Sequence, residues 1–208
     1  MQTQKWKADS GKAFDEAGKI LKEGGIIAFP TDTVYGLGAI YKNTDAVKKI
    51  FLAKGRDEGK PLSILISDIS QVPELVESVP EEAGILMEKF WPGALTIIFR
   101  KSELVPECVS AGGDTVGIRM PADPAAVNLI AAAGSPLAAP SANLSGKRSS
   151  VSFEDVMEDL DGRIDGAIDG GSCPVGISST VLDLSGESFR ILREGTVTAE
   201  MIQQELCQ

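Results

Sequence analysis

Hydrophobic positions along the chain follow two spacings, one typical of helices and one typical of buried strands. Helical spacing predicts helices over about 11–23, 43–54, 80–90, 124–133, 152–160 and from 198 onward. Short apolar runs predict strands over 26–29, 61–66, 95–99, 115–120, 136–139, 164–169, 179–184 and 189–193. Helices and strands are interspersed, and no Ser/Gly-rich linker or internal repeat divides them. The sequence therefore predicts one α/β domain over 1–208, with a core over about 10–205 and a twisted, mixed, open sheet flanked by helices.

Local signals support several of the predicted helix starts. Ser10 and Ser152 are suited to cap the helices that follow them, and Asn43 or Thr44 begins another. Asp123 stands before a proline at the start of an alanine-rich helix, which is a typical opening. These signals fix the helix boundaries more closely than periodicity alone.

The stretch over 24–38 joins a buried strand to a polar segment. Its apolar run stops at Pro30, and Thr31, Asp32, Thr33 and Tyr35 follow. Ligands of α/β proteins favour the loops at strand ends, so this pattern predicts a site there. A simple strand followed by a turn is the alternative. Asp32 is suited to hold Mg²⁺, to orient an amine or to cap the turn.

Composition narrows the chemistry that such a site can perform. The 208 residues include no histidine, which excludes a Ser-His-Asp triad, a Cys-His pair and an imidazole metal site. The net charge of −10 argues against a broad nucleic-acid surface. The three cysteines form no disulfide or metal-knuckle pattern, and no apolar run approaches the ~20 residues that span a bilayer. We therefore expect a cytoplasmic protein with no membrane contact.

Cations gather at the end of the second predicted helix, although the chain as a whole is acidic. Lys54, Arg56 and Lys60 lie within seven residues there. Basic residues also favour helix C-termini because of the helix dipole, so a structural role is the alternative.

A second polar cluster follows the strand over 136–139. Ser141, Asn143 and Ser149 lie in a loop with one glycine and two cations. Backbone amides and hydroxyls in such a loop can form an anion-binding nest, although the spacing differs from a Walker A loop. A polar surface loop is the alternative.

A third group lies on the later strands. Thr115 and Arg119 are four residues apart on one strand, so they share a face. Ser179 and Arg193 lie on two further strands. Arg119 stands among apolar residues, where it needs either an anionic ligand or a carboxylate partner in a salt bridge. Together the three groups indicate a pocket for a compact polyanion such as a nucleoside triphosphate.

Five motifs, in order, resemble the YrdC-like family and cover roughly residues 10 to 205. They are the stretch over 24–38, Lys54-x-Arg56 with Pro61-Leu62, Ser141-x-Asn143, the segment over 176–183 and the segment over 192–195. The resemblance implies the YrdC-like α/β fold and an ATP-dependent nucleotidyl transfer. L-threonine, bicarbonate and ATP would give threonylcarbamoyl-AMP and pyrophosphate for the t6A modification of tRNA. Mg²⁺ would accompany ATP, held mainly by its phosphates, and the partners would be the threonylcarbamoyl transferase machinery and tRNA.

The resemblance also implies residue roles. The L-threonine contacts would be Thr33, Arg119, Ala139 and Ser179. The ATP contacts would be Arg56, Lys60, Thr115, Ser141, Ser149 and Arg193. The catalytic core would be Lys54, Arg56, Ser141 and Asn143, with Lys54 and Arg56 over the developing charge and no metal ligands from the protein.

The chain departs from the family pattern at three positions. Leu65 stands where many members carry a histidine, Lys60 where asparagine is usual, and Ser178 where glutamate is usual. We expect the short, single-domain family form. Three other functions stay open: a YciO-type paralogue, a hydrogenase-maturation carbamoyltransferase and a non-catalytic RNA-binding module.

Overall fold

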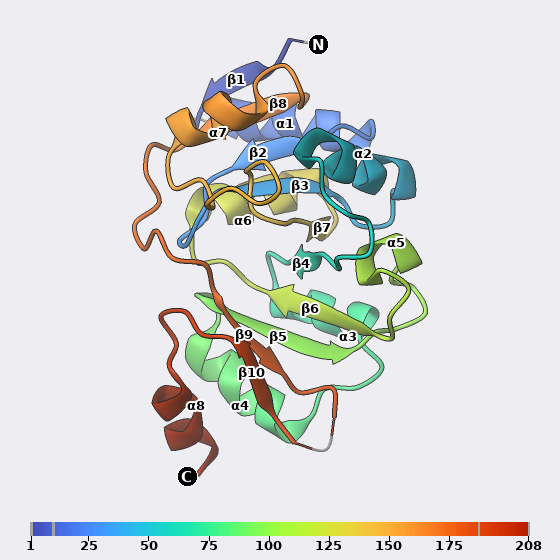
Figure 1. The fold of residues 1–208 in the computed structure, drawn as a ribbon, viewed down its shortest axis with the longest axis vertical. Helices are drawn as coiled ribbons and strands as arrows, with labels where there is room; N and C mark the ends of the chain where they lie inside the picture. The colour runs from blue at the N-terminus through green and yellow to red at the C-terminus, as the bar shows by residue number, and fades with distance from the viewer. Residues whose placement is uncertain (1, 10, 187, 208) are drawn as a thin grey trace.

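A mixed sheet of ten strands runs through the computed structural model, which describes residues 2–9, 11–186 and 188–207 (Figure 1). In their order across the sheet the strands are β1 (Gln4–Lys7), β8 (Gly166–Asp169), β2 (Ile27–Phe29), β3 (Gly36–Ile40), β7 (Leu137–Ala138), β4 (Ser63–Leu65), β6 (Thr115–Arg119), β5 (Leu95–Arg100), β9 (Thr180–Asp183) and β10 (Arg190–Arg193). Both parallel and antiparallel neighbours occur along this order, for example the parallel pair β4–β6 and the antiparallel pair β5–β6. The predicted α/β class with a mixed sheet is confirmed.

Helices cover both faces of the sheet. They are α1 (Gly11–Lys22), α2 (Thr44–Lys54), η1 (Ile69–Gln71), α3 (Val72–Leu75), α4 (Glu81–Phe90), α5 (Glu107–Ser110), α6 (Pro124–Ala133), α7 (Phe153–Leu160) and α8 (Ala199–Leu206). Figure 1 shows α1 and α6 behind the upper part of the sheet, with α2 and α7 in front of it. The eight strands and six helices predicted from periodicity are therefore all present, with boundaries within two residues of the prediction.

Alternation along β2 explains this layering. Ile27 and Phe29 are fully buried against the apolar faces of α1 and α6. Ala28, which points to the opposite face, is buried with residues of α2 and α7. At Gly18 of α1 an added Cβ would lie 2.9 Å from the Ala132 carbonyl carbon of α6, so this glycine permits the close approach of the two helices.

Helix caps agree with the local signals. Asn43 Oδ1 accepts from Ala46 N at 3.0 Å, and Asp123 accepts from Ala125 N at 2.7 Å. Ser152 forms a capping box with Asp155. The expected cap at Ser10 lies outside the described residues.

Two strands were missed by the sequence analysis, and each has a physical reason. β1 (Gln4–Lys7) is polar and mostly exposed at the edge of the sheet, so it lacks an apolar run. β3 (Gly36–Ile40) contains two glycines and was expected to continue the polar loop. It is buried between β2 and β7, and Gly38 leaves room for Phe29, whose ring would lie 2.8 Å from an added Cβ.

Candidate active site

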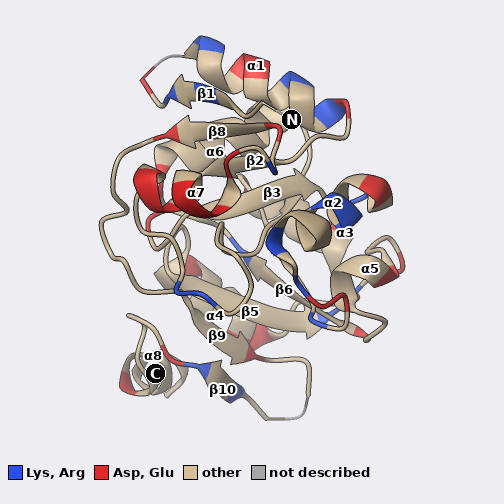
Figure 2. Ribbon diagram, turned by 45° about the horizontal axis from the view of Figure 1, so that its top comes forward, with Lys and Arg blue, Asp and Glu red and all other residues tan. Residues whose placement is uncertain are grey.

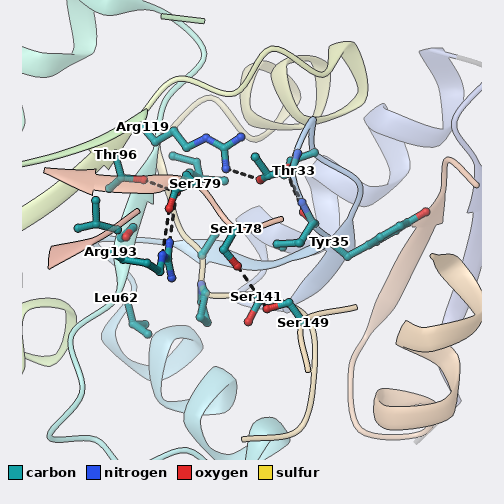
Figure 3. A pocket seen from close by; sticks show the side chains of 18 of the residues that line it. Thr33, Tyr35, Leu62, Thr96, Arg119, Ser141, Ser149, Ser178, Ser179 and Arg193 are labelled. Atoms are coloured by element: carbon teal, nitrogen blue, oxygen red, sulfur yellow. Dashed lines mark hydrogen bonds between the residues drawn. The ribbon is translucent and has the colours of Figure 1, made fainter. Parts of the chain in front are cut away.

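One cavity collects polar side chains from strands that are far apart in the sequence (Figure 3). Its volume is about 220 Å³. That lies below the ~300 Å³ at which pockets for drug-sized ligands begin, so a larger ligand would extend through its open side. The wall includes eight of the predicted site residues, together with Leu65: they are Thr33, Arg56, Arg119, Ala139, Ser141, Ser149, Ser179 and Arg193. The predicted convergence of separate strand ends is therefore confirmed.

The first and third sequence motifs are joined directly by backbone hydrogen bonds. Leu37 N donates to Pro140 O at 2.9 Å, and Ala142 N donates to Tyr35 O at 2.8 Å. Tyr35 N donates to the carbonyl of Ser150 at 2.9 Å. These bonds extend the sheet into the two polar loops, so the loop over 141–149 and the stretch over 31–36 form one continuous wall.

The end of α2 directs two neighbouring cations differently. Gly55 adopts φ +58°, a left-handed conformation that ends the helix. Lys54, the last helical residue, is 2% exposed and donates through Nζ to the carbonyls of Ser141 and Asn143. Arg56 follows the turn and lines the cavity. Lys54 was expected over the developing charge; it lies instead beneath the loop, off the cavity wall.

Arg56 carries a polar atom without a partner. Its Nη2 donates to Pro61 O at 3.0 Å, but its buried Nε has no hydrogen-bond partner. Burial lowers the pKa of the guanidinium, an effect that the nearby Asp57 opposes. Among the described residues no carboxylate forms an ion pair with Arg56. An unpaired buried donor of this kind is unusual in proteins and is suited to an anionic ligand.

Arg119 has the opposite environment. Its Nε donates to Gly93 O at 2.8 Å, its Nη1 to Thr33 Oγ1 at 2.7 Å and its Nη2 to Asp32 Oδ1 at 2.6 Å. Asp32 also accepts from Ala122 N at 3.0 Å. Burial lowers the pKa of Arg119, whereas the Asp32 carboxylate raises it. The salt-bridge alternative for Arg119 is thus confirmed, and Asp32 Oδ1 binds Arg119 and Ala122 rather than capping its own turn.

A chain of hydroxyl contacts links two further strands. Arg193 Nε donates to Ser179 O at 2.9 Å, and its Nη2 donates to Ser179 Oγ at 3.3 Å. Ser179 Oγ lies 2.8 Å from Thr96 Oγ1 on β5 (Figure 3). Burial lowers the pKa of Arg193, and no described carboxylate pairs with it. Arg193 therefore presents charge to the cavity without a neutralising partner.

The loop over 141–149 uses its amides differently from the prediction. Leu144 N binds the carboxylate of Asp159 in α7 at 2.9 Å, so this amide is already occupied by an internal anion. Asn143 is 5% exposed, accepts from Ser141 Oγ and donates to Lys147 O at 3.0 Å. Ser141 and Ser149 alone of these loop residues reach the wall. The loop presents these two hydroxyl side chains to the cavity, while the amides of Ala142, Leu144 and Ser145 bind other parts of the protein.

Four predicted residues lie off the wall. Lys54 and Asn143 are buried behind the loop, as described above. Lys60 is exposed in the segment before β4, and Thr115 lies at the opposite end of β6 from Arg119. The ATP contacts expected at Lys60 and Thr115 stay predictions, since neither side chain lines the cavity.

Two polar residues of the wall, Ser63 and Thr96, were not predicted from the sequence. Thr31 and Tyr35, from the stretch over 24–38, and Ser178, from the segment over 176–183, also line the wall. Thr96 is 2% exposed and is the one polar residue in the stretch over 95–99, and this polar interruption of an apolar run was a usable sequence signal. Tyr35 directs its ring away from the cavity (Figure 3), and its hydroxyl donates to Gly171 O at 2.9 Å.

Within 2–9, 11–186 and 188–207, no group of three or more acidic or cysteine side chains is arranged to hold a metal ion. Over the same ranges, no helix combines the length and apolar composition that a bilayer crossing requires. Acidic residues are prominent on α7, close to the cavity loop (Figure 2).

Comparisons with known proteins identify similar chains. Residues 19–195 match the Sua5/YciO/YrdC family, described as "telomere recombination". Threonylcarbamoyl-AMP synthase of Bacillus subtilis (strain 168) is 48% identical over 211 residues, which covers 98% of this chain and 61% of the relative. A crystal structure of Pyrococcus abyssi Sua5 complexed with L-threonine has a TM-score of 0.95 at 42% identity and covers 99% of this chain and 61% of that chain. The crystal structure of E. coli YciO has a TM-score of 0.85 at 26% identity, covering 97% of this chain and 98% of that one.

The coverage of these relatives is unequal. The chain spans about three fifths of the length of the Bacillus relative and of the Pyrococcus structure, at 61% in each case. It spans nearly all of YciO, at 98%. The expectation of a short, single-domain family form stays a prediction.

Proposed function

This chain belongs to the Sua5/YciO/YrdC family, and from that premise we propose that it condenses L-threonine, bicarbonate and ATP into threonylcarbamoyl-AMP and pyrophosphate. The proposal makes it a nucleotidyltransferase whose product serves the t6A modification of tRNA through a threonylcarbamoyl transferase. Higher identity to the Pyrococcus Sua5 than to YciO, 42% against 26%, favours this activity over that of a YciO-type paralogue.

The observation that carries the proposal is the convergence of three arginines on one cavity in a chain of net charge −10. Two of them, Arg56 and Arg193, have no carboxylate partner among the described residues, and Arg56 Nε has no partner at all. Arg56 is half-buried and Arg193 is exposed, and cations that lack a counter-charge attract an anionic ligand. A triphosphate supplies several anionic oxygens close together, which suits this end of the cavity.

The other end of the cavity suits an amino acid. An arginine carries five N–H donors, and the three hydrogen bonds of Arg119 leave two for a ligand. Two donors are the number that a carboxylate accepts in a bidentate pair. Thr33 and Ser179 place hydroxyls nearby, and Leu65 and Ala139 supply an apolar surface for a methyl group. L-threonine carries all three complementary groups.

The proposed reaction joins two anions. The threonine amine forms an N–C bond to the carbon of bicarbonate, with loss of water, and a carbamate results. A carbamate oxygen then attacks the α-phosphorus of ATP as the bond to the β-phosphate breaks and pyrophosphate leaves. Cationic side chains fixed around the cavity reduce the repulsion and hold the reacting groups in line.

Each arginine has a separate task in this scheme. Arg56 and Arg193 face the phosphates and stabilise charge that develops on pyrophosphate. Arg119 orients the threonine carboxylate, and Asp32 holds Arg119 in place. Mg²⁺ enters as part of the nucleotide substrate, coordinated by phosphate oxygens, because the described residues offer no protein cage for it.

Pyrophosphate release tests the proposal. The protein is incubated with MgATP, L-threonine and bicarbonate, and each substrate is omitted in turn. We expect release only when all three are present, with threonylcarbamoyl-AMP detected by mass spectrometry. Release that ignores threonine or bicarbonate, or salt-sensitive RNA retention without turnover, would contradict the proposal.

A further inference from the structure

The loop over 141–149 lies between two buried side chains of opposite charge. On one side Lys54 Nζ donates to the carbonyls of Ser141 and Asn143, and Lys54 O accepts from Ser145 N at 2.9 Å. On the other side Asp159 Oδ2 accepts from Leu144 N at 2.9 Å. The loop backbone is therefore attached to α2 at one surface and to α7 at the other.

Asp159 is held as an anion in this position. Its side chain is 8% exposed. Burial opposes ionisation, but hydrogen bonds from Lys147 Nζ, at 2.6 Å, and from Leu144 N outweigh it and keep the pKa of the carboxyl below its usual value. Burial and the charge of Arg56 lower the pKa of Lys54 to about 8, and Asp159 is the neighbouring group that raises it. The Asp159 carboxylate thus favours the protonated form of the buried lysine, while its direct ion pair is with Lys147.

The other acidic residues of α7 have different roles. Asp155 completes the capping box, accepts from Val151 N at 2.9 Å and pairs with Arg148. Glu158, next to Asp159, is exposed. Asp155 thus touches the loop over 141–149 through the exposed side chain of Arg148, whereas Asp159 is buried and accepts from a backbone amide of the loop.

We propose that Asp159 is a positioning residue for the cavity: with Lys54 it clamps the loop over 141–149 so that Ser141 and Ser149 face the ligand. The effect on turnover rests on the proposed function, whereas the effect on the loop does not. Asp159 itself is absent from the cavity wall, so it acts through the loop and through the charge of Lys54.

Two variants test this clamp. Asp159→Asn keeps the size of the side chain and an acceptor for Leu144 N but removes the charge. Glu158→Gln removes a neighbouring, exposed charge from the same helix and serves as the control. Hydrogen exchange over the segment 141–149 is measured with steady-state kinetics against MgATP across pH.

The expected results separate a positioning role from general destabilisation. In Asp159→Asn, exchange over 141–149 becomes faster by about tenfold while exchange in α4 and α8 is unchanged. The KM for MgATP rises by roughly tenfold with a smaller change in kcat, the split expected when binding geometry is lost. The basic limb of kcat/KM moves to lower pH by about one unit, because Lys54 loses the charge that favours its protonated form. Glu158→Gln matches wild type in all three measurements.

Wild-type exchange over 141–149 in Asp159→Asn overturns the proposal, whatever the activity. If the wild-type protein shows no threonine-dependent turnover, the proposed function is contradicted instead. The hydrogen-exchange comparison between wild type and Asp159→Asn still tests the clamp in that case. If Asp159→Asn does not fold, Asp159→Glu provides the same test, since it moves the carboxylate by one methylene while keeping the charge. Faster loop exchange then supports the clamp, and wild-type exchange overturns it.

Discussion

Arg119 and Arg56 line the same cavity but are held in opposite ways. Arg119 is 5% exposed, and its three nitrogens all donate to protein oxygens, one of them on Asp32. Arg56 has a buried Nε without a partner and no ion pair among the described residues. A paired arginine is rigid and partly neutralised, whereas an unpaired arginine keeps its full attraction for an anion. The difference indicates that one end is built for orientation and the other for charge.

The largest expected effect is on stability at the paired end. Asp32→Ala leaves Arg119 buried without its carboxylate, and breaking a buried pair in this way costs about 3–5 kcal/mol. Urea unfolding measures the loss. A loss of unfolding free energy below about 1 kcal/mol would mean that Arg119 does not depend on Asp32. That result would contradict the distinction between a paired and an unpaired arginine.

A slightly smaller effect, on activity, is expected at the unpaired end. Arg56→Ala should reduce formation of threonylcarbamoyl-AMP by about a hundredfold, the scale for losing one preorganised donor of about 3 kcal/mol. Its unfolding free energy should stay close to wild type, because Arg56 makes one hydrogen bond to the protein. Lys48→Ala, an exposed cation on α2, is the control. Near-normal turnover by Arg56→Ala would remove Arg56 from the mechanism.

Lys54, which is buried against the loop over 141–149, should make the free energy of unfolding depend on pH. The pKa of Lys54 falls from 10.5 to about 8 on folding, so between those values the unfolded chain binds more protons than the folded one. The free energy of unfolding of the wild type should therefore rise with pH relative to Lys54→Met, by roughly 1–3 kcal/mol from pH 8 to pH 10.5. Chemical denaturation of both proteins across this range measures the difference. A difference that stays constant with pH would contradict the buried, partly deprotonated lysine.

The smallest effect is expected at the hydroxyl pair formed by Thr96 of β5 and Ser179, which directly precedes β9. Thr96→Val keeps the shape of the side chain but removes the 2.8 Å contact with Ser179 Oγ, at about 1 kcal/mol. The KM for L-threonine should rise about fivefold while the KM for MgATP stays the same, and Thr96→Ser should restore the wild-type value. Equal changes in both constants would place Thr96 outside the amino-acid end.

Local chemistry made much of the fold predictable. Asn43, Asp123 and Ser152 cap the helices that they were expected to cap. The missed strands lacked the usual signals, because β1 is polar at a sheet edge and β3 is rich in glycine. Strand pairing with distant segments, which a local pattern does not encode, determines both.

The site was predictable as a set of residues but less so as an arrangement. Sequence placed Arg56, Arg119, Ser141 and Arg193 in one pocket, as observed. The sequence could not show that Lys54 lies beneath the loop while Arg56, two residues later, faces the cavity. Both are cations at the same helix end, and the left-handed turn at Gly55 between them gives them different directions. Nor could it show that Asp32, 87 residues from Arg119, is the partner of that arginine.

A crystal structure with MgATP and L-threonine bound tests the central claim most directly. The account predicts a phosphate oxygen within hydrogen-bond distance of Arg56 Nε, with Arg193 facing the same phosphates. It also predicts the threonine carboxylate on Arg119, with the Asp32 pair intact. A triphosphate bound away from Arg56 and Arg193, or a threonine carboxylate on Arg56, would contradict the division of the cavity into a paired and an unpaired end.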